Sequence, residues 1–353
     1  MNKQQVYIRG TGIVSPLGGS IAETLAALRE NRSKVAPLDL FPLLQGSPLP
    51  VGQVRGIDTE PTLPRTHQLA LTAATQAMAG YDRPPDAIVI GTTTGGIPTT
   101  EQLLRDGITD KNQYRLHGLN TVADELGRHF NCSGPVLTVS TACSSGAVAI
   151  TLAMELLRGR QAENVLVGGV DSLCRLTYFG FHSLQLVDKN GCRPLDKNRR
   201  GMAVAEGAGM LLLSSEKKAD TPVELLGAGL SCDAFHPAAP HPEGKGARTA
   251  MRAALADAGL SPRAIDYINL HGTGTPENDL AESRAVRALF PTPPALSSIK
   301  GATGHSLAAA GAIEAVIASL CITQDLVPAN TGLRQVDPDL KLHPVTKPED
   351  RPV

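Results

Sequence analysis

The chain has 353 residues, with 33 Lys and Arg residues against 34 Asp and Glu residues, so its formal net charge is -1. A chain of this length can bury a sizeable core, and 42% of its residues are hydrophobic. The balanced charge provides no overall positive field for nucleic acid or an anionic membrane. We therefore expect no nucleic-acid partner.

No run of about 18 residues is free of charged or strongly polar residues, and the best candidate for a membrane span, Ala308–Ile322, is interrupted by Glu314. The N-terminal segment MNKQQVYIRG lacks the apolar stretch of a secretory signal. The 6 cysteines form no C-x-x-C pair, which argues against a zinc knuckle and a disulfide framework. The sequence predicts a cytoplasmic protein with no membrane span and no metal site.

Short apolar runs alternate with helical patterns along the chain. Buried strands are predicted at Val6–Ile8, Ala87–Ile90, Val136–Val139, Val165–Val167, Met210–Leu213, Val223–Leu226 and Tyr267–Leu270. Helices are predicted at Ile21–Arg29, Gln68–Ala79, Gly146–Leu157, Ala247–Ala258 and Leu307–Leu320. This alternation favours a layered α/β fold with a substantially parallel sheet.

Three kinds of segment occur twice in the same order, which predicts two related halves. The pairs are Val6–Ile13 with Val223–Leu230, the strands at Asp86 and Asp266, and the strand-turn-helix units near Val139–Ile150 and Ile299–Ile313. Because the offsets between the pairs differ, chance similarity of common strand-turn-helix units remains an alternative.

The segment V-S-T-A-C-S-S-G-A-V-A-I, from Val139 to Ile150, places the thiol of Cys143 where a strand ends and a helix begins. A helix N-terminus favours an anion by about 0.3–1 kcal/mol at an exposed site. We therefore expect the pKa of Cys143 to lie below that of a free thiol. The alternative is an inert, buried cysteine in a tight turn.

Two histidines lie in turns of the kind that hold ligands in α/β folds. His271 opens H-G-T-G-T-P directly after the predicted strand at Tyr267–Leu270, and His305 lies in G-H-S-L-A-A-A-G. Each histidine taken alone is more often structural. One thiol with two such imidazoles nevertheless supplies what acyl transfer needs, a thiolate to hold an acyl group and Nε2–H donors to stabilise an enolate or oxyanion.

The motifs TACSSG, HGTGT and GHSLAAAG, in this order, resemble those of the β-ketoacyl-acyl-carrier-protein synthases, specifically the elongating Cys-His-His type of this thiolase-fold family. The resemblance extends from about Val6 to about Pro338 and includes RGTGIVSPLG, VGGVD and CRPLDKNRRGM. It implies an α/β, five-layered α-β-α-β-α fold made of two pseudo-duplicated halves. Residues 1–217 would carry the nucleophile, and residues 218–353, incomplete at their C-terminus, would carry both histidines.

The resemblance also implies an acyltransferase for decarboxylative Claisen condensation in fatty acid, polyene or polyketide biosynthesis. Cys143 would accept an acyl chain from a carrier protein, and His271 and His305 would bind the malonyl thioester carbonyl. No cofactor is expected beyond the phosphopantetheine that the acyl carrier protein brings. The implied assembly is a homodimer or a heterodimer with a chain-length factor.

Further roles follow from the same resemblance. Lys300 and Glu314 would form a buried ion pair that orders the histidine loops, the alternative being a surface pair that contributes about 0–1 kcal/mol. Asp279 and Glu282 would extend this network.

Substrate contacts are implied for another set of residues. Thr273 and Thr275 would donate hydrogen bonds to the pantetheine arm, and Met202, where an aromatic residue is common, would admit a longer or planar acyl chain. The residues implied to attract an acidic carrier protein are Arg193, Lys197, Arg199 and Arg200.

Family members usually continue into a Gly-rich loop and a last strand, which the sequence lacks after K-P-E-D-R-P-V. That loop supplies an oxyanion-hole amide, and one such donor contributes about 2.7–4 kcal/mol to catalysis. From the resemblance we expect either a shortened form of a working enzyme or a sequence that is part of a longer chain.

Other functions within the fold remain to be weighed. A thiolase would need a second catalytic cysteine near its C-terminus, and the given sequence has none after Cys321. An initiating synthase would carry Asn in place of His305, so the histidine favours an elongating enzyme. A non-catalytic partner subunit, similar to a chain-length factor, is the alternative function, and such proteins lack the nucleophile that Cys143 would provide.

Overall fold

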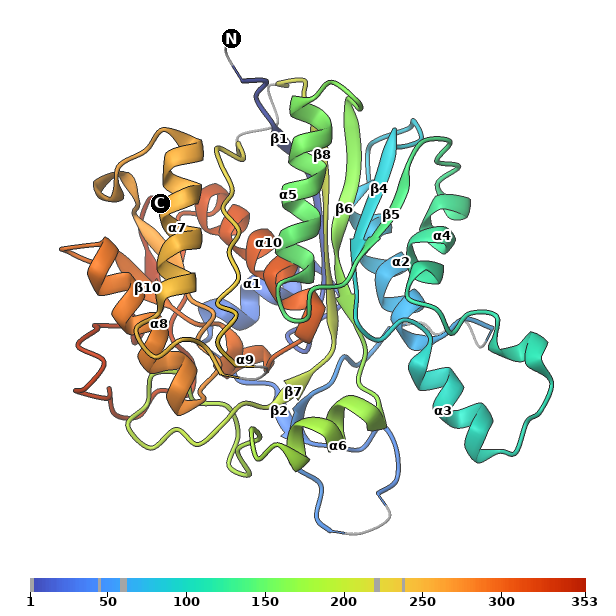
Figure 1. Cartoon of the computed structure of the whole chain (residues 1–353), viewed down its shortest axis with the longest axis horizontal. Coiled ribbons are helices and arrows are strands. Elements are labelled where there is room, and N and C mark those ends of the chain that lie inside the picture. Colours follow the sequence, from blue (N-terminus) through green and yellow to red (C-terminus); the bar gives the residue numbers. More distant parts are fainter. Residues whose placement is uncertain (1–2, 44–45, 58–61, 219–222, 237–238) are drawn as a thin grey trace.

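The computed structural model describes residues 3–43, 46–57, 62–218, 223–236 and 239–353 (Figure 1). The strands are β1 (Tyr7–Val14), β2 (Val35–Pro37), β3 (Pro50–Gly52), β4 (Ala87–Gly91), β5 (Val136–Val139), β6 (Asn164–Asp171), β7 (Val204–Ala205), β8 (Gly207–Ser214), β9 (Tyr267–Asn269), β10 (Ala295–Ser297), β11 (Leu326–Val327) and β12 (Glu349–Asp350). The α-helices are α1 (Ile21–Arg29), α2 (Arg65–Ala77), α3 (Ile97–Arg105), α4 (Asn120–His129), α5 (Ser145–Arg158), α6 (Arg175–Ser183), α7 (Lys245–Ala258), α8 (Pro276–Leu289), α9 (Lys300–Thr303) and α10 (Ala310–Thr323). Short 3₁₀ turns are η1 (Lys111–Tyr114), η2 (Pro262–Ala264) and η3 (Leu307–Ala309).

The largest sheet has the strand order β1-β8-β6-β4-β5. Only β8 runs against its neighbours, so the other strands of this sheet share one direction. The prediction of a substantially parallel sheet is therefore confirmed. On β6, Val165 and Val167 face one core and Leu166 and Val170 face the other, so its apolar run is continuous because both faces of the sheet are covered.

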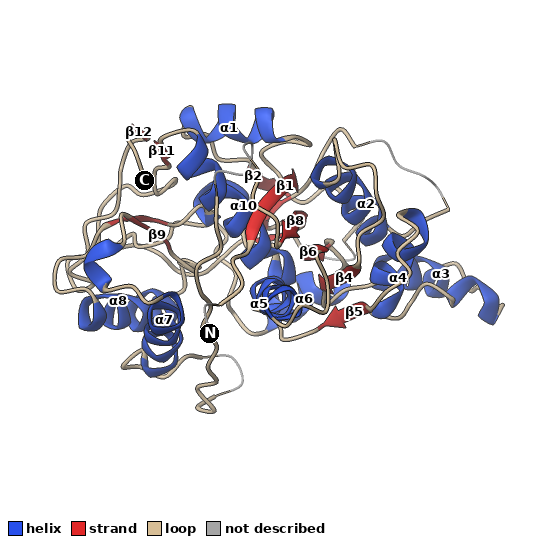
Figure 2. Cartoon of the chain, turned by 90° about the horizontal axis from the view of Figure 1, so that it is seen from above, coloured by secondary structure: helices blue, strands red, loops and turns tan. Residues whose placement is uncertain are grey.

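Helices and sheets alternate in five layers. Figure 2 shows the large sheet from its end, with α2 and α4 on one face and α5 and α10 on the other. Beyond α10 lie the parallel pair β9 and β10 and then α7 and α8. Since α10 from the C-terminal half packs against β8 and β6, one hydrophobic core spans both halves. The predicted site residues Cys143, His271 and His305 lie along this shared boundary.

The same kind of contact, between a glycine and the backbone of a helix, occurs in both halves and supports the internal duplication. A Cβ atom on Gly10 or Gly12 would lie 2.0 or 1.9 Å from the carbonyl oxygen of a residue in α2, so β1 touches the helix backbone directly. In the second half, a Cβ atom on Gly229 would lie 2.1 Å from the carbonyl oxygen of Ala250 in α7. Both contacts require glycine because no side chain fits between the two backbones.

Several predicted elements differ from the structure. The predicted strand Val223–Leu226 is wrong, because that segment forms only an isolated bridge between Glu224 and Tyr7. The predicted helix Leu307–Leu320 is divided into η3 and α10, because Leu307 lies in the left-handed region with φ 52°. Helices α3, α4, α6, α8 and α9 were not predicted, and α3 buries none of its residues.

Within the described ranges, no helix has both the length and the apolar character that a bilayer crossing requires. The cysteines carry no disulfide, and all 6 thiols are free.

We expect Gly12→Ala to lower the free energy of unfolding by about 1–3 kcal/mol or more, because the added methyl group collides with the backbone of α2. Denaturation by guanidinium chloride measures the change. The matched control is Gly180→Ala in α6, where nothing lies within 4 Å of the added Cβ and where the substitution should stabilise the helix by about 0.5–1 kcal/mol. Equal effects of the two substitutions would contradict the packing argument.

Candidate functional site

Cys143 lies in the turn between β5 and α5. The turn is tight because Ala142 has φ 54°, a left-handed conformation that is uncommon for a residue with a side chain. Hydrogen bonds hold it: the N–H of Thr141 donates to Ser145 Oγ at 2.9 Å, and that hydroxyl donates to the carbonyl oxygen of Ala142 at 2.6 Å. These bonds leave Cys143 partly exposed at the rim of the sheet.

The expectation of a lowered thiol pKa is wrong. Burial raises the pKa of Cys143, and the positive charge of Lys300 opposes this shift while the negative charges of Asp171 and Glu314 add to it. The stabilisation of a thiolate by a helix N-terminus is too weak to outweigh the loss of hydration on burial. The extent of this burial cannot be seen in the sequence. The resting thiol is therefore protonated near neutral pH.

His271 follows β9 and contacts the ammonium group of Lys300, with 3.4 Å between Lys300 Nζ and His271 Nδ1. An ammonium group can only donate, so Nδ1 accepts and the ring proton lies on Nε2. Burial, followed by the charge of Lys300, lowers the pKa of His271 to about 3. This imidazole is thus a neutral hydrogen-bond donor.

His305 is held in the same tautomer by the main chain. The N–H of Leu307 donates to His305 Nδ1 at 3.2 Å, so the ring proton again lies on Nε2. The two imidazole rings have centroids 5.2 Å apart and meet edge to face. Burial and the charge of Lys300 place the pKa of His305 well below its usual value. Two neutral Nε2–H groups therefore lie side by side.

Lys300 is only 1% exposed and forms an ion pair with Glu314 of α10. The predicted buried pair is present, and the surface-pair alternative is wrong. Burial raises the pKa of Glu314, and the charge of Lys300 opposes that shift. Because both charges are removed from water, each depends on the other.

Two carboxylates shape the loop that carries His271. Glu282 accepts the N–H groups of His271 and Gly272 at 2.7 and 2.8 Å. Asp279 accepts the N–H of Gly274 at 3.2 Å and that of Leu195 at 2.8 Å. Both residues lie on α8, so they join the network predicted for them by fixing the loop's main chain.

The predicted substrate-binding residues lie in different surroundings. Thr273 and Thr275 come together, with 2.8 Å between their hydroxyl oxygens. Met202 is 3% exposed and packs in a cluster with Tyr178 and Leu307. It borders the turn of His305, while its predicted role in chain length stays a prediction.

The predicted basic surface is smaller than expected. Arg199 is buried and pairs with Asp337 at 2.5 Å and Asp279 at 3.5 Å, so its assignment to a carrier surface is wrong. Arg193 pairs with Asp188 at 3.2 Å. Lys197 and Arg200 remain exposed. Charge along the sequence indicates a basic cluster but not which guanidinium groups neighbouring carboxylates neutralise.

Ser298 is a structural member of the site that sequence reasoning missed. Its Oγ donates to the carbonyl oxygen of Gly272 at 2.8 Å and accepts the N–H of Lys300 at 3.2 Å, so it joins the loop of His271 to the segment of Lys300. The available signal was its place directly after the buried strand β10.

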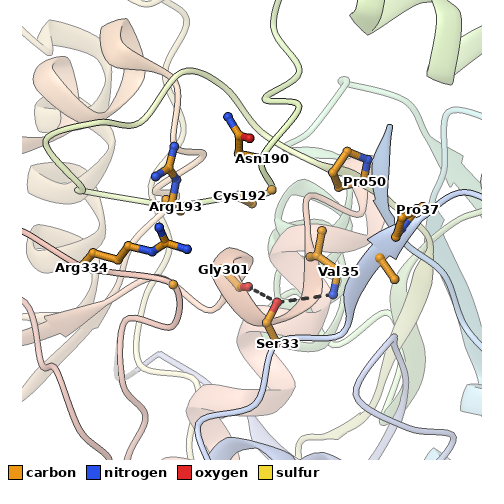
Figure 3. A pocket seen from close by; sticks show the side chains of 12 residues that line it. Ser33, Val35, Pro37, Pro50, Asn190, Cys192, Arg193, Gly301 and Arg334 are labelled. Carbon is orange, nitrogen blue, oxygen red and sulfur yellow. Dashed lines mark hydrogen bonds between the residues drawn. The ribbon is translucent and has the colours of Figure 1, made fainter. Parts of the chain in front are cut away.

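A cavity of about 210 Å³ adjoins these loops (Figure 3). Arg193, Arg334 and Asn190 form its polar side, while Val35, Pro37 and Pro50 form its apolar side. The buried thiol of Cys192 in its wall donates to the carbonyl oxygen of Thr273 at 3.3 Å. The cavity thus lies behind the His271 loop, and Cys143, His271 and His305 do not line it.

Comparison with known families and proteins gives consistent matches. Residues 54–219 match the model of the β-ketoacyl synthase N-terminal domain, and residues 223–334 match that of its C-terminal domain. The chain is 30% identical to 3-oxoacyl-[acyl-carrier-protein] synthase 2 of Synechocystis sp., over 97% of this chain and 91% of the relative. It is 33% identical to nodulation protein E of Rhizobium meliloti, over 96% of this chain and 91% of the relative.

Solved structures give the same picture. The ishigamide ketosynthase/chain length factor matches with a TM-score of 0.91 and 30% identity, covering 100% of this chain and 94% of that chain. The ketosynthase ApeO in complex with its chain length factor ApeC, from Xenorhabdus doucetiae, matches with a TM-score of 0.86 and 33% identity, covering 95% of this chain and 88% of that chain. The predicted thiolase-like fold is confirmed.

We expect His271 to make the fold sensitive to acid. Because the pKa of His271 is about 3 in the folded chain and the ordinary pKa of histidine is 6.5, the unfolded chain binds the proton first as pH falls. The free energy of unfolding should therefore fall as pH drops from about 6.5 to about 3, by up to about 1.4 kcal/mol per pH unit. Denaturation between pH 6.5 and 5 should show a smaller slope for His271→Asn, and equal slopes would refute a neutral, buried His271.

We expect Lys300→Met to lower the free energy of unfolding by about 3–5 kcal/mol, because Glu314 is left buried without its cation. The double substitution Lys300→Met/Glu314→Leu should restore most of that loss, since no unpaired charge remains. The control Arg29→Met breaks an exposed pair with Asp350 and should cost about 0–1 kcal/mol. Chemical denaturation of the wild type and the three variants measures these effects, and a double variant no more stable than Lys300→Met would contradict the pairing.

Proposed function

Because the chain belongs to the β-ketoacyl synthase family, we propose that it is an elongating 3-oxoacyl-[acyl-carrier-protein] synthase whose nucleophile is Cys143. The observation that carries this assignment is the grouping of two neutral imidazoles around one buried ammonium group whose charge also acts on Cys143. A decarboxylating site needs hydrogen-bond donors for an enolate, and His271 and His305 each provide an Nε2–H.

In the first half-reaction, Cys143 sulfur attacks the carbonyl carbon of an acyl group bound to the pantetheine of a carrier protein. A bond forms from carbon to Cys143 sulfur, the bond to pantetheine sulfur breaks, and the proton of Cys143 ends on the departing thiol. The charge of Lys300 favours the transient thiolate, because it lowers the pKa of Cys143 against the effect of burial.

In the second half-reaction, a malonyl thioester loses its carboxylate as CO₂. The electron pair of the broken C–C bond forms an enolate, whose oxygen accepts hydrogen bonds from Nε2–H of His271 and His305. The carbanion then attacks the acyl carbonyl, a new C–C bond forms, and the bond to Cys143 breaks. A proton from solvent restores the thiol, and the chain has grown by two carbons.

Neutral imidazoles suit this step better than charged ones. A doubly protonated ring would protonate the enolate carbon and quench condensation, whereas a neutral ring stabilises the oxygen and keeps its proton. Lys300 and burial together lower the pKa values of both rings, which supports this assignment. The reaction as proposed needs no cofactor on this chain.

The partners that we propose are an acyl carrier protein and a second subunit. The similarity to a ketosynthase that is in complex with a chain length factor supports a heterodimer, and a homodimer is the other form. In this chain β5 ends the described part of the large sheet, and the residues after it, Ser140 to Ala142, are exposed beside Cys143. A free strand edge next to the nucleophile supports pairing there.

We also propose a cytoplasmic location. The free state of all 6 cysteines agrees with a reducing compartment. The alternative function, a non-catalytic partner subunit, is disfavoured by the presence of Cys143 in a tight, hydrogen-bonded turn.

The test is the intact mass of the protein after incubation with an acyl-loaded carrier protein. We expect one acyl adduct on the wild-type chain and none on Cys143→Ala, because the acyl group is held as a thioester on the sulfur of Cys143. Addition of malonyl carrier protein should then remove the adduct and leave a carrier-bound product that is longer by one CH₂–CO unit. A folded wild-type chain without an adduct would instead identify a non-catalytic subunit.

A further inference from the structure

Asp171 is a fully buried carboxylate at the end of β6. It accepts six hydrogen bonds, of which five come from Thr92, Thr93 and Thr94, the residues that follow β4. The sixth comes from the C-terminal half of the chain, where the N–H of Ala308 in η3 donates to Asp171 Oδ2 at 2.9 Å. This one side chain therefore joins the half that carries Cys143 to the turn that carries His305.

The main chain at Ala308 is held from a second side as well. A Cβ atom on Gly146, in the first turn of α5, would lie 2.8 Å from the carbonyl oxygen of Ala308. A Cβ atom on Gly169 in β6 would lie 2.6 Å from the same oxygen. The carbonyl group thus rests against the glycines of both elements while the N–H of the same residue binds Asp171. Little freedom remains for this peptide unit.

The peptide next to it is strained. Leu307 has φ 52°, and a left-handed conformation costs about 1–2 kcal/mol for a residue with a side chain. It is in this conformation that the N–H of Leu307 donates to His305 Nδ1. A strained residue keeps its conformation only when its neighbours are firmly held, and Asp171 holds the next residue along the chain.

We propose that Asp171 is a positioning residue for His305: its bond to the N–H of Ala308 keeps Leu307 left-handed and thereby keeps the Nε2–H tautomer of His305 directed at the substrate. The effect on turnover rests on the function proposed above, whereas the effect on the tautomer does not. Asp171 touches no reacting atom in this assignment.

Asp171 has a second, opposite effect on the same site. Its negative charge raises the pKa of Cys143, which Lys300 lowers and Glu314 raises. Removing the carboxylate should therefore make the thiol easier to ionise while it makes His305 a poorer donor. General loss of structure would not separate the two properties in this way.

The experiment compares wild type, Asp171→Ala, Asp171→Asn and a matched control, Asp196→Asn. Asp196 is also fully buried and accepts three backbone N–H groups, from Asn198, Arg334 and Gln335, but it does not contact η3. Release of CO₂ from malonyl carrier protein gives kcat and KM. Alkylation of Cys143 by iodoacetamide against pH gives the thiol pKa, and ¹⁵N NMR of the histidine rings, assigned with His305→Gln, gives the tautomer.

For Asp171→Ala we expect kcat for CO₂ release to fall about 10- to 100-fold with KM changed by less than about 3-fold, because a displacement near 1 Å has effects of this size. The alkylation profile should move to lower pH, and the His305 signals should change from one tautomer to a mixture. Asp171→Asn should recover part of kcat, since its amide oxygen can accept the N–H of Ala308. Asp196→Asn should change none of the three.

Three results would overturn the proposal: unchanged His305 signals in Asp171→Ala, unchanged kcat in that variant, or equal losses in Asp196→Asn. A wild-type chain that releases no CO₂ refutes the proposed function instead, and the NMR comparison then decides the positioning role by itself. If Asp171→Ala does not fold, Asp171→Asn decides, and a fall in kcat of that variant with the His305 signals of the wild type would refute the role.

Discussion

One buried cation, the ammonium group of Lys300, acts on Cys143 and on both histidines of the site. Burial is the main cause that lowers the pKa values of His271 and His305, and the charge of Lys300 lowers them further, while the same charge opposes the rise that burial causes in the pKa of Cys143. A buried charge is costly without a partner, and Glu314 on α10 supplies one. One charge thus acts on Cys143 and on both histidines, although the thiol and the imidazoles come from different halves of the chain.

Carboxylates organise the loops around this cation. These loops lack the regular hydrogen bonding of helices and strands, so their buried N–H groups need other acceptors. The carboxylate of Glu282 accepts the N–H of His271, that of Asp279 accepts the N–H of Gly274, and that of Asp171 accepts the N–H of Ala308. Burial raises the pKa of each of these acids, to about 7 for Glu282, while the N–H donors act in the opposite direction. Each acid therefore depends on the loop that it orders.

The sequence allowed the positions of site residues to be predicted where residue type and spacing are sufficient. Cys143 and His271 could be placed after strands, and His305 in a turn before a helix, because the flanking apolar runs and small residues are local features. Properties set by distant packing could not be predicted in this way. The raised pKa of Cys143 comes from burial, and the neutralisation of Arg199 comes from Asp279 and Asp337. The segment Val223–Leu226 has the apolar pattern of a strand but only a bridge to Tyr7.

The paired glycines of the two halves have a consequence for how the chain can vary in length. Gly10 and Gly12 meet the carbonyl groups of Ala77 and Ala73, and in the second half Gly229 meets that of Ala250. Two residues along a strand span about 6.6 Å and four along a helix about 6 Å, so strand and helix are commensurate over these contacts. Insertion of one residue in either element would bring a side chain against the helix backbone. Each half can therefore change length in its connecting loops, while the segment and the helix that meet at these points must keep their register.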